Sequence, residues 1–575
     1  MKFRRNLITA FFSMVGTTCW SSEAARQRGP TSKWRNRVQT WLLCVALLPA
    51  VAQAQFTFTT NNGTITFTGY TGTNSSVVIP ITTNGYPVTA IGGAFSQNSP
   101  TTLKSVTIPD SVKIIGDGAF NDCFNLTNVS MGQGVTSIGS SAFAFCGNLT
   151  GVTLPNSLTN IGGSAFWFCG LTNVTIPKSV VSLGDAALAA CYSLKAITVD
   201  TKNPVFTNQA GVLFDIRQTT LLQYPGAKTG SYTIPATVTS IGDSAFSYCH
   251  NLNSISITNA ITSIGKGAFY VCSPLTNVTI GDQVTNIGEA AFRACLGLTG
   301  VTMPNGVLSI GSQAFNDCTS LINITIPQSV TSIGDGAFSG CNRLTAINVN
   351  TSNAFYSSLD GVLFDINKTT LLQCPAGGAG SYTIPATVTS IGDNSFYGCT
   401  SLTNIVIRNG VTNIGYEAFS DCTNLTNVTI PKSVLKLGGW AFIYCFSLRS
   451  IFSQGDAPSL SSPGALGNNS QAIVYYLPGT ENWKSLFGGL PTRLWNPQPQ
   501  NDASFGVQNK RFGFNITGSG NLVIVVEGCT NLTNPIWSPI STNTLNTFIG
   551  TNGTSYFSDP QWTNYPGRFY RLRSP

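Results

Sequence analysis

Side chains that commonly carry catalysis are scarce in this 575-residue sequence. His250 is the one histidine, and a lone imidazole lacks the partners that a hydrolase triad or a multi-histidine zinc site requires. Acidic pairs could serve glycoside hydrolysis, but the aspartates recur at one position of a repeated unit, where a structural role explains them. We therefore expect His250 to be a loop residue and predict no catalytic residue, no cofactor and no metal site.

Twelve cysteines recur with the period of that unit, at positions 123, 146, 169, 191, 249, 272, 295, 318, 341, 399, 422 and 445. No C-x-x-C pair occurs among them, so the spacing does not support zinc. Export would permit disulfides. Every interior cysteine would, however, have two equivalent neighbouring cysteines, so the spacing does not specify a unique disulfide partner. We predict small, buried, reduced side chains that pack as hydrophobes.

The repeated unit itself is about 23 residues long. An apolar-Gly dipeptide marks it at 91, 115, 138, 161, 183, 241, 264, 287, 310, 333, 391, 414 and 437, with most steps of 22 to 24 residues. Two steps are 58 residues, and each contains a Gly-Val-Leu-Phe-Asp insert, beginning at Gly211 and at Gly361. The inserts lie 150 residues apart, so we infer that a block of several repeats was duplicated whole.

Each unit predicts two short strands and one turn. Leu-x-x-Val-x-Ile alternates apolar and polar residues as a half-buried strand does, and the following Pro ends it. Val-x-x-Ile-Gly forms a second extended piece. The segment Asp/Ser-x-Ala-Phe-x-x-Cys suits a short helical turn capped by Asp117, Asp185, Asp243, Asp335 or Asp393. Such coils bury their apolar sides only by stacking, so we predict a mainly β solenoid.

This consensus resembles the BspA-like leucine-rich repeats of bacterial surface proteins, over about residues 56–455. The Gly-Val-Leu-Phe-Asp insert is similar to that family as well. The resemblance implies ligand binding or adhesion at the surface of a bacterial cell, and it brings no catalytic residue with it. No Asn follows the Leu-x-x-Val-x-Ile core, which departs from the commoner leucine-rich repeat.

The ends of the chain divide into further parts. Residues 1–54 form a predicted signal peptide with an N-terminal extension, with an apolar stretch from Trp41 to Val51 and an A-x-A site before Gln55. Residues 55–90 are an expected N-terminal cap, 91–455 the solenoid with inserts at about 200–232 and 350–382, and 456–500 a C-terminal cap and linker. Residues 501–575 leave the repeat, and we predict a small β-sandwich-like module.

Charge argues against nucleic acid as a partner. The formal net charge is +8, but residues 1–54 hold eight basic residues and one acid, so 22 basic and 21 acidic residues follow. No basic face remains to release counterions from a nucleic acid. We expect a secreted or cell-surface monomer with no membrane span after signal cleavage.

The predicted binding surface is the outward side of the first strand in each unit. Alternation turns a row of Thr and a row of Asn to solvent, and we select Thr153, Thr175, Thr279, Thr302, Thr325, Asn277 and Asn323 as candidates. The β-propensity of Thr alone could also explain the row. Our leading hypothesis is a platform for an extracellular protein or glycan, with the two inserts as lateral features. The alternatives are a structural spacer that displays the C-terminal module and an ice-binding Thr face.

Overall fold

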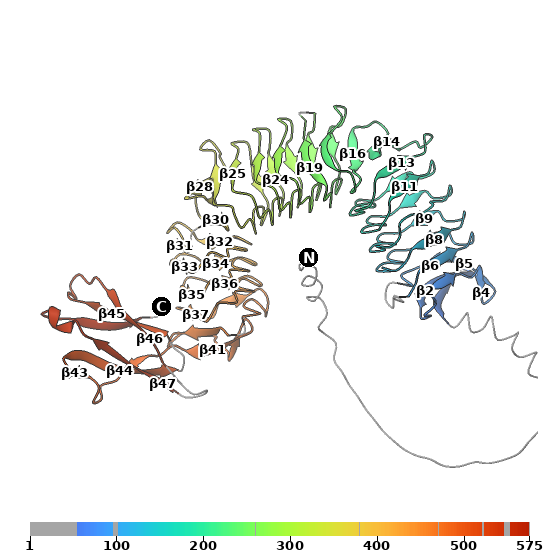
Figure 1. Cartoon of the computed structure of the whole chain (residues 1–575). Helices are drawn as coiled ribbons and strands as arrows, with labels where there is room; N and C mark the ends of the chain where they lie inside the picture. The colour runs from blue at the N-terminus through green and yellow to red at the C-terminus, as the bar shows by residue number, and fades with distance from the viewer. Residues whose placement is uncertain are drawn as a thin grey trace, which may run out of the picture. The chain divides into compact units, whose positions relative to one another are not determined.

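The computed structural model describes residues 55–95, 102–258, 260–378, 380–469, 471–519, 523–545 and 552–573. The predicted signal peptide and N-terminal extension, residues 1–54, lie outside these ranges. From Gln55 onward the chain is one folded unit of strands and turns, in which successive coils stack along the chain (Figure 1). The one helical segment among the described residues is the 3-10 turn η1, Trp562–Asn564.

The first strand of each coil alternates buried and exposed residues, as the sequence predicts. In β8 (Asn128–Met131), Val129 and Met131 are buried while Asn128 and Ser130 are exposed. Neighbouring coils pair these strands in parallel and in register. The series is β3 Ser76–Val78, β6 Ser105–Ile108, β8, β11 Asn173–Ile176, β13 Ala196–Val199, β17 Gly230–Thr233, β19 Leu252–Ser256, β21 Asn277–Thr279, β23 Gly300–Thr302, β25 Asn323–Ile326, β27 Ala346–Val349, β31 Ser381–Thr383, β33 Asn404–Val406, β35 Asn427–Ile430, β37 Ser450–Ser453 and β39 Ile473–Tyr476.

The second strand is only two residues long and ends on the apolar residue of the apolar-Gly dipeptide. These strands also pair in parallel, for example Ser137 with Asn160 and Ile138 with Ile161. The series is β7 Ile114–Ile115, β9 Ser137–Ile138, β10 Asn160–Ile161, β12 Ser182–Leu183, β18 Ser240–Ile241, β20 Ser263–Ile264, β22 Asn286–Ile287, β24 Ser309–Ile310, β26 Ser332–Ile333, β32 Ser390–Ile391, β34 Asn413–Ile414, β36 Lys436–Leu437 and β38 Ser459–Leu460.

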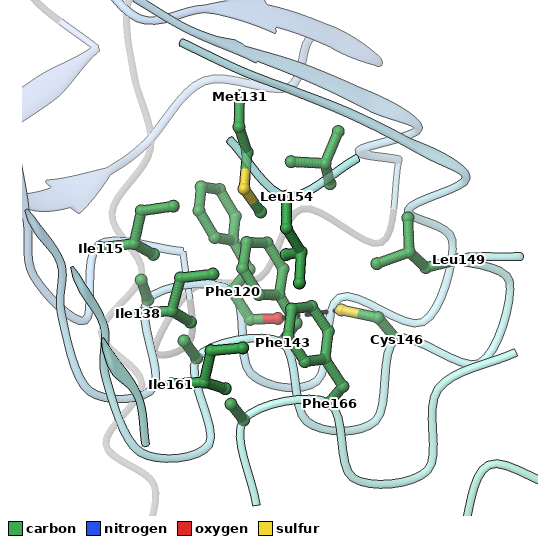
Figure 2. Packing of buried hydrophobic residues seen from close by; sticks show 14 of the residues in the cluster. Ile115, Phe120, Met131, Ile138, Phe143, Cys146, Leu149, Leu154, Ile161 and Phe166 are labelled. Atoms are coloured by element: carbon green, nitrogen blue, oxygen red, sulfur yellow. Dashed lines mark hydrogen bonds between the residues drawn. The ribbon is translucent and has the colours of Figure 1, made fainter. Parts of the chain in front are cut away.

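The core consists of ladders of identical side chains, one from each coil (Figure 2). Phe120, Phe143 and Phe166 are fully buried, and the rings of Phe143 and Phe166 lie 5.3 Å apart and 3° from parallel. The isoleucines of the short strands form a second ladder beside the rings. Burying these side chains is the main stabilising contribution to the stack, because no single coil has another apolar surface to cover them.

The turn that contains Ala-Phe is not helical, which corrects the sequence prediction. Every second backbone N–H of the turn bonds to the next coil, as Phe143 N donates to Ala165 O at 2.8 Å. The N–H groups between them bond three residues back, as Ala144 N donates to Ser141 O at 3.1 Å. The residue before each cysteine has a positive φ, 62° at Phe145 and 57° at Phe168, which an α-helix does not allow. Stacking therefore takes about half of the hydrogen bonds that a helix would have used.

The aspartates predicted to cap this turn bond between coils as well. The Oδ1 atoms of Asp117, Asp243 and Asp393 each accept the backbone N–H of a residue in the following coil, at 2.7 Å. Asp185 and Asp335 contribute their backbone carbonyls, which accept from Ser164 and Gln313 of the preceding coil. The period of the acids thus reflects coil-to-coil bonding and not helix capping.

Each insert forms a three-stranded antiparallel unit inside the stack, so it is not a lateral feature. In β15, Val212, Leu213 and Phe214 are all buried. Leu213 packs into the core on the N-terminal side, and Val212 and Phe214 pack into the core on the C-terminal side. The strands are β14 Phe206–Gln209, β15 Val212–Asp215 and β16 Thr220–Gln223, repeated as β28 Tyr356–Leu359, β29 Val362–Asp365 and β30 Thr370–Gln373.

Further strands close both ends of the stack. At the N-terminal end lie β1 Phe56–Asn61, β2 Thr64–Tyr70, β4 Thr82–Thr83 and β5 Tyr86–Ile91. The C-terminal end has β40 Leu486–Phe487 and β41 Leu490–Leu494. The all-β module that follows has two sheets, made of β42 Gln498–Pro499, β43 Gly506–Gln508, β44 Arg511–Ser519, β45 Val523–Cys529, β46 Ser538–Thr544, β47 Asn552–Asp559 and β48 Phe569–Arg573.

The module shares one buried cluster with the last coils. Phe452 of β37 and Tyr475 of β39 pack in the same cluster as Phe514 and Ile516 of β44. None of the described residues forms an apolar helix of the length needed to cross a membrane.

Candidate functional site

The outward side of the first-strand series, which we call the strand face, places all seven predicted residues in solvent. Thr153, Thr175, Thr279, Thr302, Thr325, Asn277 and Asn323 are exposed. Inward neighbours such as Val278 and Ile324 are buried, at 2% and 1% exposure. The predicted alternation therefore holds at these positions, while all four residues of β37 are buried.

The structure brings only some of these residues side by side. Thr279 and Thr302 are direct partners in the parallel pair β21–β23. Asn277 lies opposite Gly300, and its Oδ1 accepts a hydrogen bond from the Thr299 hydroxyl at 3.3 Å. Thr325 and Asn323 belong to the separate two-stranded sheet β25–β27. The hydrogen-bonded sheets of the strand face are therefore short, and they divide the rows of Thr and Asn into segments.

Thr153 lies at one of these interruptions. Residues 151–155 form no strand, and the sheets end at β8 on one side and begin at β11 on the other. The sequence signal is a missing residue: Leu171 follows Cys169 by two positions, whereas Leu149 follows Cys146 by three. The shortened loop coincides with this interruption; the sheets also break between β23 and β25, where both Cys–Leu spacings are three residues.

The interruption leaves a hollow of about 480 Å³ on the strand face. Thr153 and Thr175 line it, so two of the predicted residues meet there. Hydroxyls, amides and one carboxylate make up the rest of its polar lining: Asn128, Thr150, Asn156, Thr172, Asn173 and Asp200. We call this the strand-face hollow. It was not predicted, although the shortened Cys169–Leu171 loop could have indicated it.

The cysteine ladder has no features of a reactive site. All twelve periodic cysteines are buried and free. Most of their thiols donate to a phenylalanine carbonyl of the preceding coil; Cys146 Sγ lies 3.3 Å from Phe120 O (Figure 2). Burial raises the pKa of Cys191 and Cys341 to about 12, so the nucleophilic thiolate is disfavoured. The prediction of buried, packed cysteines is confirmed.

His250 lies at the edge of a turn, as predicted, and is half-buried. Its ring centroid is 4.9 Å from that of Tyr192 and 6.0 Å from that of Tyr248. Burial lowers the pKa of His250, which favours the neutral imidazole at neutral pH. The aromatic neighbours of His250 were not anticipated from the sequence.

Solved structures similar to this chain include several bacterial leucine-rich repeat proteins. A leucine rich cell surface protein from Faecalibacterium prausnitzii is 25% identical, with 61% of this chain and 93% of that chain covered and a TM-score of 0.34. A leucine-rich repeat protein from Bacteroides ovatus is 27% identical, with 66% and 94% covered and a TM-score of 0.34. The pneumococcal vaccine antigen PcpA is 19% identical, with 70% and 91% covered and a TM-score of 0.40. No curated protein matches the chain.

A family comparison covers more than half of the sequence. The sequence model of the BspA type leucine rich repeat region matches residues 75–210, 224–345 and 376–462, in six copies. These ranges contain the cysteine ladder and most strands of the coils, leave out most of each insert, and stop before the C-terminal module. The chain therefore belongs to the BspA-type leucine-rich repeat family.

Proposed function

We propose that this protein acts outside the cell, secreted or held at the cell surface, and binds an extracellular protein or glycan through its strand face. The proposal is for binding and not catalysis. The strand-face hollow carries it: a concave region of about 480 Å³, whose polar lining is hydroxyl and amide groups with one carboxylate, Asp200, suits a polar ligand held by hydrogen bonds. Family membership supports the same function, as does the A-x-A motif before Gln55.

The test uses residues 55–575, probed on a glycan array and against immobilised extracellular-matrix glycoproteins. Replacing Thr153 and Thr175 by Lys places two long cations in the hollow, and both side chains are exposed, so we expect the fold to survive. Binding to the best probe should fall about tenfold or more, which corresponds to about 1.4 kcal/mol. The affinity of the wild-type protein for this probe should depend weakly on salt concentration, because few ion pairs contribute to binding.

Thr279→Lys with Thr302→Lys is the matched control, since this pair lies on the same face away from the hollow. Loss in the first variant alone assigns binding to the hollow, and loss in both extends it along the face. Unchanged binding in both variants would contradict the proposal.

The packing of the module against the last coils favours a second candidate, a spacer that displays residues 501–575. Deleting residues 103–251 joins Thr102 to Leu252, which has the same repeat position as Leu103, and removes the hollow. A spacer retains its binding in this variant, whereas a strand-face platform loses it. Deleting residues 252–401, one full duplication period, keeps the hollow and is the control. An ice-binding Thr face is the third candidate, and thermal hysteresis of residues 55–575 tests it.

A further inference from the structure

A second group of side chains outside the core lies on the turn side of the coils, next to the first insert. Five coil turns, those ending at Cys146, Cys169, Cys191, Cys249 and Cys272, contribute aromatic rings that touch one another. Successive ring centroids are 4.6 to 6.1 Å apart. The group, which we call the aromatic cluster, comprises Phe145, Trp167, Phe168, Tyr192, Tyr248, His250 and Tyr270.

The cluster is separate from the core ladder. The core position is taken by Phe143, Phe166, Phe246 and Phe269, all fully buried, and by Leu188, 3% exposed, in the turn that ends at Cys191. The cluster residues are partly exposed, and Tyr192 is exposed to 39%. The rings thus form a surface of their own.

The backbone does not favour aromatic residues at these positions. Phe145, Phe168 and Tyr248 have φ values of 62°, 57° and 61°, a region that Asn, Asp and Gly occupy far more readily than bulky residues. Local conformational preference therefore does not explain the choice of aromatic side chains.

The duplicated block provides an internal control. At the matching positions it has polar or small residues with the same backbone: Asp317 with φ 59° for Phe168, and Gly398 with φ 71° for Tyr248. The inter-coil bond from Tyr248 N to Tyr270 O, 2.7 Å, is repeated from Gly398 N to Ser420 O, 2.9 Å. Asn316, Asn342, Thr400 and Ser420 replace Trp167, Tyr192, His250 and Tyr270. One aromatic, Tyr397, stands where the first block has Ser247. Stacking beside an insert therefore does not require the cluster.

The chemistry of the cluster selects a neutral ligand. Burial raises the pKa of Tyr192 and Tyr248 and lowers that of His250, so the three polar rings are uncharged at neutral pH. At one edge the Arg293 guanidinium lies 5.9 Å from the centre of the Tyr270 ring, and its charge opposes a cationic ligand. Aromatic faces offer apolar area at low entropy cost, while phenol and imidazole groups hydrogen-bond. Pyranose rings match both properties, with C–H groups on one face and hydroxyls around the rim.

We propose that the aromatic cluster is a second binding site, independent of the strand face, for the pyranose rings of a neutral glycan. The cluster spans several stacked coils, so it would contact more than one sugar ring of a chain. The proposal does not depend on the strand-face hollow being a site.

The experiment is affinity electrophoresis of residues 55–575 in gels that contain a neutral glucan, mannan, galactan or xylan. The swap variant Tyr192→Asn, His250→Thr, Tyr270→Ser replaces each residue by its counterpart in the second block. We expect at least one of these polysaccharides to retard the wild-type protein, and the swap to weaken binding about tenfold or more. Binding should also change the tryptophan fluorescence, and Trp167→Phe should remove that change.

The matched control is Asn342→Ala with Thr400→Ala, at the exposed second-block counterparts of Tyr192 and His250, and this variant should bind the polysaccharide as the wild type does. Circular dichroism and thermal unfolding establish that the swap variant is folded. Two results would overturn the proposal: no retardation of the wild type by any of the four polysaccharides, or equal retardation of the wild type and a folded swap variant. If the swap variant keeps its polysaccharide binding but no longer binds a deglycosylated glycoprotein that the wild type binds, the partner of the cluster is a protein and the proposal is wrong.

Discussion

The sequences of the two duplicated blocks of the solenoid agree in the interior and differ on the turn side. We compare a first block, residues 161–272, with a second block, residues 310–422. Their interiors match closely: Asn203 and Asn353 are both buried, and each side-chain amide donates to two backbone carbonyls of the preceding coil, at 2.8 to 3.0 Å. Phe214 and Phe364 are both fully buried in their inserts.

Their turn sides do not match. The first block carries all of the aromatic cluster except Phe145, whereas the second carries Asp317, Asp421 and Tyr397. Burial raises the pKa of both aspartates, and it raises the pKa of Tyr397 to about 12 with help from these carboxylates. This difference indicates that the interior and the inter-coil backbone hydrogen bonds determine the fold, while the turn-side residues can differ in chemistry.

The largest expected effect tests the similarity of the interiors. Phe214→Ala and Phe364→Ala each remove a fully buried ring from an insert that packs between two cores. We expect each to lower the free energy of unfolding by about 4 kcal/mol, through lost burial and the cavity left behind. Urea unfolding of residues 55–575 measures both. A difference of more than about 2 kcal/mol between them would show that the blocks are not equivalent inside.

An intermediate effect concerns the cysteine ladder, which both blocks share. Burial raises the pKa of Cys191 and Cys341 from 9.0 to about 12, so only the unfolded chain ionises these thiols as the pH rises above about 9. These two thiols then add no pH dependence to the stability below that pH, and between about 9 and 12 they lower it by about 1.4 kcal/mol per pH unit and thiol.

Urea unfolding at pH 8, 9 and 10 checks this slope, and Cys191→Ala and Cys341→Ala should each reduce it equally. Thiol titration provides a second check, with few of the fourteen described thiols reactive in the folded protein and all of them reactive in denaturant. A low count in denaturant would indicate disulfides in place of free thiols.

The smallest effect is expected on the turn side. Tyr192 and Asn342 hold matching exposed positions in the two blocks. Exchanging them, as Tyr192→Asn or Asn342→Tyr, should change the free energy of unfolding by less than about 1 kcal/mol, because surface substitutions rarely do more. If Tyr192→Asn lowers the free energy of unfolding by several kcal/mol, the aromatic cluster stabilises the first block. The conclusion that turn-side residues can differ without affecting the fold would then be wrong.

Most of the fold and part of the candidate site could be predicted from residue order. The period of Leu-x-x-Val-x-Ile fixed the first strand, and alternation placed Thr279 outside and Val278 inside, because successive strand residues point to opposite faces. The spacing of Cys and Ala-Phe indicated the buried ladders. The helical turn was wrong because its propensity competes with inter-coil bonds such as Phe143 N to Ala165 O, which no single unit contains.

What the sequence determined by itself is therefore the content of one coil: its length, its inward side and its outward side. Only the tertiary structure decided how one coil meets another. It broke the strand face at Thr153, where residues 151–155 form no strand, and it placed the inserts between cores and not beside them. It also brought the ring centroid of Trp167 to 6.1 Å from that of Tyr248, across an insert. The physical reason is that burial and alternation act within a few residues, whereas pairing depends on the alignment of segments that stacking alone brings together.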